Sequence, residues 1–277
     1  MSALRPERGA AAPSFILVDE LGEAGAELSL PDAESHYVAR VCRARAGDHV
    51  RATDGRGTLA ELELLEVGKS VRARIRSAGR REREREAELW CGAPEGERAD
   101  WLIEKLAELG TARVLLIDTE RARWKAGAAR LARWRRLAIA ALRQSQQCWR
   151  MEILGATEWS AALEALEAAL PPGDCRDAPR GAESTHASAH LDAGRWLADP
   201  QGPPPGAAPR SGTTLGAVGP AAGFSPAERS ALLTRGFQPM SLAAGRLRTE
   251  TAALAWAAWW AGGGGSASSV GGEAPGA

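Results

Sequence analysis

The sequence has few cysteines, few histidines and no long apolar run. Its four cysteines are scattered without a CxxC pair, which excludes a disulfide framework and a cysteine zinc site. The four histidines form no HExxH motif, and His186 and His190 lie in a Ser/Ala/Gly-rich stretch without a third ligand. No apolar run approaches the roughly 20 residues that span a bilayer, and residues 1–12 lack the apolar core of a secretory signal. We therefore expect a cytoplasmic protein without a metal or a membrane span.

Positive charge is carried almost entirely by arginine. Only three of the 35 basic residues are lysine, and 35 acidic residues bring the net charge to zero, which by itself argues against a nucleic-acid partner. The arginines nevertheless cluster in residues 72–85 and 121–136. The first cluster is interleaved with Glu82, Glu84 and Glu86, so part of it is equally explained as a solvated, self-paired segment. Charge alone leaves RNA binding open.

Short extended runs dominate the first third of the chain. Alternating apolar residues and separating turns predict strands at residues 15–18, 49–53, 60–67 and 70–75. One helix-like piece covers residues 32–44. After a disordered N-terminus at residues 1–12, we expect a small β-barrel over residues 13–80.

Beyond a charged linker at residues 76–87, strands alternate with helices. Strands are predicted at residues 89–93, 113–118 and 195–198, and helices at 100–110, at 128–147 and from Trp159 onward. This alternation is typical of a largely parallel sheet flanked by helices. We expect an α/β domain over residues 86–261, mostly loop at 171–212, and a disordered tail at 262–277.

Residues 213–260 are the most informative segment. A strand (213–218) leads into the loop GPAAG (219–223), and Ser225 opens a helix with Pro226 at its first position and Glu228 completing a capping box. Gly236 ends that helix.

A second strand follows at 237–242, then a loop at 243–248 and a helix capped by Thr249. Two such units bring both loops to one edge of a sheet, where α/β proteins bind ligands. The capping box explains its residues without a ligand, and GPAAG lacks both GK[ST] and GxGxxG. The pattern thus predicts only a nucleotide-type site of unspecified kind.

Four stretches resemble the ribosomal RNA small subunit methyltransferase E family, uridine-N3 enzymes of the SPOUT class. HYVARVCRARAGDHVRATDGRG (36–57) is similar to the family's amino-terminal pattern, and DWLIEKLAELGTARVLLIDTER (100–121) to its ELG…ER region. LAIAALRQSQQCWRMEIL (137–154) resembles the segment around EQS. GPAAGFSPAE and LAAGRLRTETA (242–252) resemble GPEGGFS and the loop that ends in RTETA, which is intact here.

The resemblance implies an α/β fold with a C-terminal SPOUT trefoil-knot domain preceded by a PUA-like β-barrel that binds RNA. It implies a homodimer that uses S-adenosyl-L-methionine to methylate the N3 of a uridine in 16S ribosomal RNA, free or within the small ribosomal subunit. Neither a metal nor a membrane belongs to this activity.

The same resemblance implies roles for individual residues. Arg248 is the candidate to stabilise the negative charge that spreads onto O2 and O4 when N3 loses its proton; the alternative is that it only pairs with Glu250. Glu250 either orders Arg248 or accepts the proton. The predicted cofactor-binding residues are Gly219, Pro220, Gly223, Leu242, Ala243, Leu247, Thr249 and Thr251, with the two threonines fixing the loop and the helix cap.

Five basic residues are candidates for contact with RNA phosphates. His36, Arg40 and Arg43 are expected on successive turns of one helical stripe, and Arg121 and Arg123 follow the strand at 113–118. Each one alone is equally explained as an ordinary surface charge.

The chain departs from the family pattern in both loops. Ala221 and Ala222 replace the Glu and Gly of GPEGG, while Ala243, Gly245 and Arg246 alter the second loop. If the replaced glycine needs a positive φ, Ala222 costs about 1 kcal/mol or more. The departures make a catalytically weakened or silent ribosomal RNA-binding paralogue with reduced cofactor affinity the main alternative. A generic nucleotide-binding enzyme would need a phosphate loop that is not found.

Overall fold

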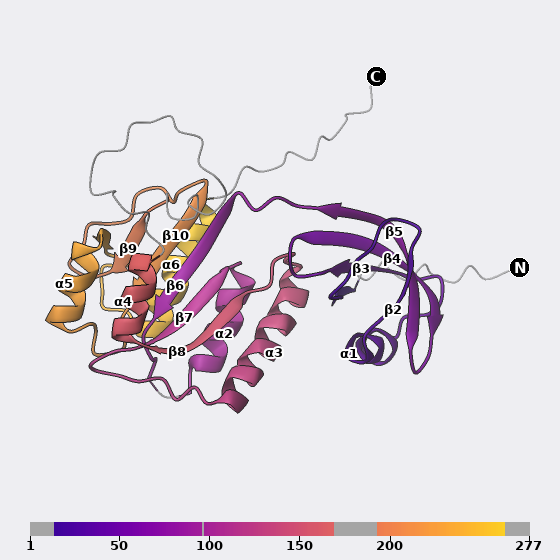
Figure 1. Cartoon of the computed structure of the whole chain (residues 1–277), viewed down its shortest axis with the longest axis horizontal. Helices are drawn as coiled ribbons and strands as arrows, with labels where there is room; N and C mark the ends of the chain where they lie inside the picture. Colours follow the sequence, from indigo (N-terminus) through magenta and orange to yellow (C-terminus); the bar gives the residue numbers. More distant parts are fainter. Residues whose placement is uncertain (1–13, 96, 169–192, 264–277) are drawn as a thin grey trace, which may run out of the picture. The chain divides into compact units, whose positions relative to one another are not determined.

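The computed structural model describes residues 14–95, 97–168 and 193–263, which fall into two compact units (Figure 1). The first unit comprises the chain up to Arg83 together with Ile103–Ala112 and Gly127–Glu152. The second comprises Glu84–Leu102, Arg113–Ala126 and the chain from Ile153 onward. Within the described residues, no helix is both long and apolar enough to cross a membrane.

The first unit is built on a five-stranded sheet with the order β1-β3-β4-β5-β2. Its strands are β1 (Phe15–Leu17), β2 (Glu27–Ser29), β3 (His49–Thr53), β4 (Thr58–Val67) and β5 (Val71–Arg80). β1 pairs with β3 in parallel and the other pairs are antiparallel. Alternate residues of β4 and β5 point into one core because successive side chains of a strand face opposite sides. These core residues are Ala60, Leu62, Leu64, Val71, Ala73 and Ile75.

The opposite face of β5 carries arginines that pair across strands. Arg72 forms ion pairs with Glu27 and Glu66. Arg74 pairs with Glu27, and Arg76 pairs with Glu63. The expected charged linker at 76–87 was therefore wrong. β5 runs to Arg80 because its backbone pairs with β4 over this stretch, and β6 begins at Arg85.

Helices complete the first unit. α1 (Asp32–His36) continues as a π-helical turn, η1 (Tyr37–Val41), so the helix is shorter than expected. α3 (Ala128–Ser145), expected as a helix at 128–147, buries Trp134 and Ala141. Arg143 of α3 forms an ion pair with the buried Glu34 of α1; burial raises the pKa of Glu34, and the guanidinium opposes that shift.

The second unit contains a six-stranded sheet with the order β11-β9-β10-β6-β7-β8. The strands are β6 (Arg85–Cys91), β7 (Arg113–Asp118), β8 (Glu152–Glu158), β9 (Arg195–Ala198), β10 (Gly212–Val218) and β11 (Phe237–Met240). The four pairings that join β11, β9, β10, β6 and β7 are parallel. Strands β2 and β8 were not predicted. β2 has only three residues, and β8 carries little apolar alternation.

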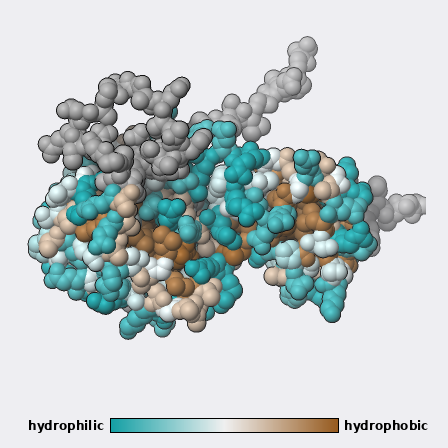
Figure 2. Space-filling view, viewed as in Figure 1, coloured by the Kyte–Doolittle hydropathy of each residue, from teal (hydrophilic) through white to brown (hydrophobic). Residues whose placement is uncertain are grey.

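Four helices accompany these strands along the chain: α2 (Ala99–Glu108), α4 (Trp159–Ala168), α5 (Pro226–Thr234) and α6 (Thr249–Gly262). α5 begins as the sequence predicts, because Ser225 and Glu228 form the capping box in both directions. α4, α5 and the strands enclose one apolar core that includes Trp90, Leu215 and Phe237. In the view of Figure 2, hydrophilic residues and patches of hydrophobic residues are both present on each unit.

Gly216 of β10 lies directly beneath Trp256 of α6. A Cβ atom at this position would stand 2.3 Å from Trp256 Cε2, and the Trp256 side chain is fully buried. α6 therefore packs on the sheet only because residue 216 has no side chain.

We expect Gly216→Ala to lower the free energy of unfolding by about 1–3 kcal/mol, the usual effect of overpacking a core. Urea unfolding followed by tryptophan fluorescence measures this change. Gly79→Ala on β5 is the matched control, because a Cβ there meets nothing within 4 Å. Equal stability of the two variants would contradict the packing argument.

Candidate functional site

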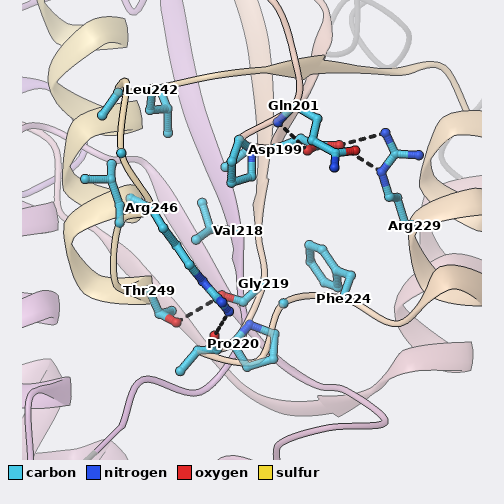
Figure 3. A pocket seen from close by; sticks show the side chains of 18 residues that line it. Asp199, Gln201, Val218, Gly219, Pro220, Phe224, Arg229, Leu242, Arg246 and Thr249 are labelled. Atoms are coloured by element: carbon cyan, nitrogen blue, oxygen red, sulfur yellow. Dashed lines mark hydrogen bonds and ion pairs between the residues drawn. The ribbon is translucent and has the colours of Figure 1, made fainter.

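A cavity of about 390 Å³ lies at the carboxyl ends of β9, β10 and β11 (Figure 3). Parallel pairing places these three ends side by side, and each strand continues into a loop that lines the cavity. The lining residues are Ala198, Asp199, Pro200, Gln201, Val218, Gly219, Pro220, Ala221, Gly223, Phe224, Arg229, Leu242, Ala243, Gly245, Arg246, Leu247, Thr249 and Ala252. Seven of the eight predicted cofactor residues are among them; Thr251 is exposed and does not line the cavity.

The backbone of the first loop, residues 219–223, is tightly constrained. A Cβ on Gly219 would lie 2.9 Å from the amide nitrogen of Phe224, so only glycine fits there. The amide of Gly223 donates to the carbonyl of Pro220 over 2.7 Å, and Gly223 has a φ of 74°. Ala222 does not have a positive φ. The strain considered for Ala222 is therefore absent, because the left-handed position of this loop is Gly223.

Two guanidinium groups hold the first loop by its carbonyl oxygens. Arg121, which follows β7, donates to the carbonyls of Ala222 over 2.9 Å and Phe224 over 3.3 Å. Arg246 of the second loop donates to the carbonyl of Ala221 over 2.7 Å, and Figure 3 shows its side chain extending toward Pro220. Because carbonyls belong to every residue, these contacts do not depend on the side chains at 221 and 222.

The second loop is joined to the first by Thr249. The helix cap predicted at Thr249 was wrong: Arg248 is the N-cap, without a side-chain hydrogen bond, and Thr249 is the first residue of α6. The Thr249 hydroxyl instead donates to the carbonyl of Gly219 over 3.1 Å. The Arg248 side chain is exposed at the N-terminus of α6.

The carboxylate of Glu250 is buried, at 2% exposure, and does not pair with Arg248 as one interpretation had it. Its partner is Arg98, whose Nη1 lies 2.6 Å from Glu250 Oε1.

Burial, with the Glu250 charge as a further cause, raises the pKa of Cys91 to about 12. That thiol therefore stays protonated at neutral pH.

Asp199 forms a polar wall of the cavity that the sequence analysis missed. Its carboxylate receives hydrogen bonds from Arg229 Nε over 2.8 Å and from the amide of Gln201 over 2.9 Å. Figure 3 shows Asp199 and Arg229 on the side of the cavity opposite Leu242. The available signal was the position of Asp199 directly after the predicted strand 195–198.

Comparison with known proteins gives these loops a context. A model described as "RNA methyltransferase domain" matches residues 81–261, and one described as "RNA methyltransferase PUA domain" matches residues 30–76. The chain belongs to the RNA methyltransferase family. The family and the α/β fold class expected from the motifs, a SPOUT domain preceded by a PUA-like domain, are thereby confirmed.

Individual RNA methyltransferases are distant in sequence but similar in structure. The ribosomal RNA small subunit methyltransferase E of Synechocystis sp. is 26% identical over 228 residues, 82% of this chain and 70% of that protein. The enzyme of the same name from Neisseria gonorrhoeae, crystallised with S-adenosyl methionine, is 25% identical, with a TM-score of 0.72. A probable rRNA-methyltransferase from Porphyromonas gingivalis is 26% identical, with a TM-score of 0.69. Both structural matches cover 89% of this chain and 96% of the other.

The basic residues predicted to contact RNA lie in different settings. His36 and Arg40 are exposed on α1 and η1, whereas Arg43 lies beyond the helix with a φ of 53°, so the expected continuous stripe was wrong. Arg123 is exposed and pairs with Glu158. His186 and His190 lie outside the described residues, among which no three His, Cys, Asp or Glu side chains converge as metal ligands do.

Backbone geometry predicts that substitutions at two neighbouring positions of the first loop both destabilise the protein, for different reasons. Ala222→Gly should lower the free energy of unfolding by about 0.4–1 kcal/mol, because glycine only adds freedom to the unfolded chain. Gly223→Ala should lower it by about 1–2 kcal/mol through left-handed strain. Differential scanning calorimetry measures both variants. A gain in stability for Ala222→Gly would contradict the backbone conformation described here.

Proposed function

We propose that this RNA methyltransferase transfers the methyl group of S-adenosyl-L-methionine to the N3 of a uridine in 16S ribosomal RNA. The observation that carries the proposal is the cavity formed by the loops after β9, β10 and β11. Its two motif loops have the order and spacing of a family whose named members include a methyltransferase crystallised with S-adenosyl methionine. The uridine target rests on the RTETA and GPAAG motifs.

The residues of the cavity fit this cofactor. Its volume lies in the range of small-molecule sites, about 300–1,000 Å³. Val218, Leu242 and Leu247 supply apolar contact for an adenine ring, and backbone groups of the two loops supply hydrogen bonds. The Asp199 carboxylate supplies an acceptor for hydroxyl or ammonium groups.

S-adenosyl-L-methionine supplies an electrophilic methyl group on a sulfonium. The bond from N3 to the methyl carbon forms as the bond from sulfur to that carbon breaks, and the N3 proton passes to solvent. In this proposal Arg248, exposed at the N-terminus of α6, stabilises the negative charge on the uracil oxygens, assisted by the helix dipole. Glu250 is a positioning residue, because its buried carboxylate is already bonded to Arg98 and anchors the first turn of α6.

Incubation with radiolabelled S-adenosyl-L-methionine and unmodified small ribosomal subunits tests the proposal. We expect label in 3-methyluridine after digestion of the RNA. Arg248→Gln should lower kcat about 10²- to 10³-fold while cofactor affinity stays within about threefold, since the guanidinium acts on charge that develops in the transition state. Binding to the subunit with weak cofactor affinity and no label on any ribosomal RNA would instead favour the silent paralogue.

The contacts of Arg121 and Arg123 predict that the two arginines differ in effect. Arg121→Gln should weaken S-adenosyl-L-methionine binding about tenfold, because the carbonyls of Ala222 and Phe224 lose their donor and the loop loosens. Arg123→Gln removes only an exposed ion pair and should change the affinity less than about twofold. Isothermal titration calorimetry distinguishes them. Equal losses would show that charge, and not loop geometry, governs binding.

A further inference from the structure

Three segments that are distant in sequence converge around Trp149 in the first unit. The turn at 54–57 binds both of the others through its backbone. The amide of Gly57 donates to the carbonyl of Cys148 over 3.0 Å, and the amide of Arg150 donates to the carbonyl of Gly55 over 2.9 Å. The amide of Arg81, just beyond β5, donates to the carbonyl of Gly57 over 2.8 Å. These bonds fix the spacing of the segments independently of their side chains.

The Trp149 ring fills the space above this turn. A Cβ on Gly57 would lie 2.3 Å from Trp149 Cζ2, so the indole rests directly on the glycine backbone. The guanidinium carbons of Arg83 and Arg80 lie 4.9 Å and 5.9 Å from the ring centroid. Contacts of this kind hold a guanidinium while leaving its N–H groups able to donate. We call Arg56, Arg80, Arg81, Arg83, Trp149 and Arg150 the Trp149 patch.

Three arginines of this patch differ from Arg72 and Arg74 of β5 in their pairing with carboxylates. Arg72 and Arg74 are held by Glu27 at 2.7 Å. By contrast, Arg80, Arg81 and Arg150 are exposed and form no ion pair among the described residues.

Two acidic residues lie in the segments that form the patch. Asp54 accepts the amides of Arg56 and Thr58 and lies 3.8 Å from Arg56 Nε. Glu82 is exposed and lies within the run of arginines. Arg80, Arg81 and Arg150 therefore leave positive charge on a surface held in place by its backbone.

We propose that the Trp149 patch is a docking surface for the phosphate backbone of the substrate RNA. Arg80, Arg81 and Arg150 contact phosphates, Arg83 and Trp149 orient the surface, and Arg56 is held by Asp54. Guanidinium groups suit this role because they present several donors in one plane to phosphate oxygens. That the target is RNA, and not another polyanion, rests on the proposed function. The patch shares no residue with the lining of the cofactor cavity or with the five basic residues predicted to contact RNA.

The test measures binding of the full chain to a 16S ribosomal RNA transcript at several salt concentrations. We expect Arg81→Gln with Arg150→Gln to weaken binding about tenfold or more and to reduce the slope of log K against log salt by about two, one for each lost phosphate contact. The matched control is Arg72→Gln with Arg74→Gln, which removes the same number of charges from arginines already bonded to glutamate. The control should leave the slope within about 0.5 of the wild-type value.

Equal losses in the patch variant and the control would overturn the proposal, since they would reflect only overall charge. Unchanged affinity of the patch variant would overturn it as well. Methyl transfer to the same RNA is measured in parallel. If the wild-type chain transfers no methyl group but the patch variant loses affinity for the RNA, the patch is supported and the proposed function is refuted. If the patch variant methylates the RNA fully with an unchanged KM, the patch alone is refuted.

Discussion

Parallel pairing of β9, β10 and β11 is the constraint on which the cavity depends. Parallel strands end at the same edge of a sheet, so the loops after Ala198, Val218 and Met240 meet there and nowhere else. The close approach of Trp256 to Gly216 then seats α6 on β10. This contact determines where Arg248 and Thr249, at the start of α6, stand relative to the first loop.

The loops themselves are held chiefly through backbone groups. Arg121 and Arg246 bind carbonyl oxygens of the first loop, and Thr249 binds the carbonyl of Gly219. A side-chain change at 221 or 222 leaves all three contacts in place. Only Gly219 and Gly223 are required as glycines, the first by close packing and the second by its positive φ. GPAAG therefore meets the backbone requirements of this loop although it departs from GPEGG at two positions.

Much of the fold and part of the site were predictable from sequence because they depend on local rules. The capping box at Ser225, the alternation along β4 and β5 and the loops after two successive strands all follow from short-range patterns. Partners distant in sequence did not follow. Glu250 pairs with Arg98 and not with its neighbour Arg248, and Arg72, Arg74 and Arg76 pair across strands and not with Glu82 and Glu84. Asp199 was missed because a single carboxylate in a Pro/Gly-rich stretch has no periodicity to mark it.

The arginines show why net charge says little about this protein. Formal neutrality hides three distinct settings. Arg72, Arg74 and Arg76 are bonded to carboxylates, Arg121 and Arg246 bind loop carbonyls around the cavity, and Arg80, Arg81 and Arg150 are exposed in the Trp149 patch. Charge bonded to a neighbouring carboxylate produces little field beyond a Debye length, roughly 8–10 Å at physiological ionic strength, whereas uncompensated charge attracts a polyanion. Attraction to RNA is therefore set by how many arginines lack a carboxylate partner. That number is decided by tertiary pairing, which composition does not contain.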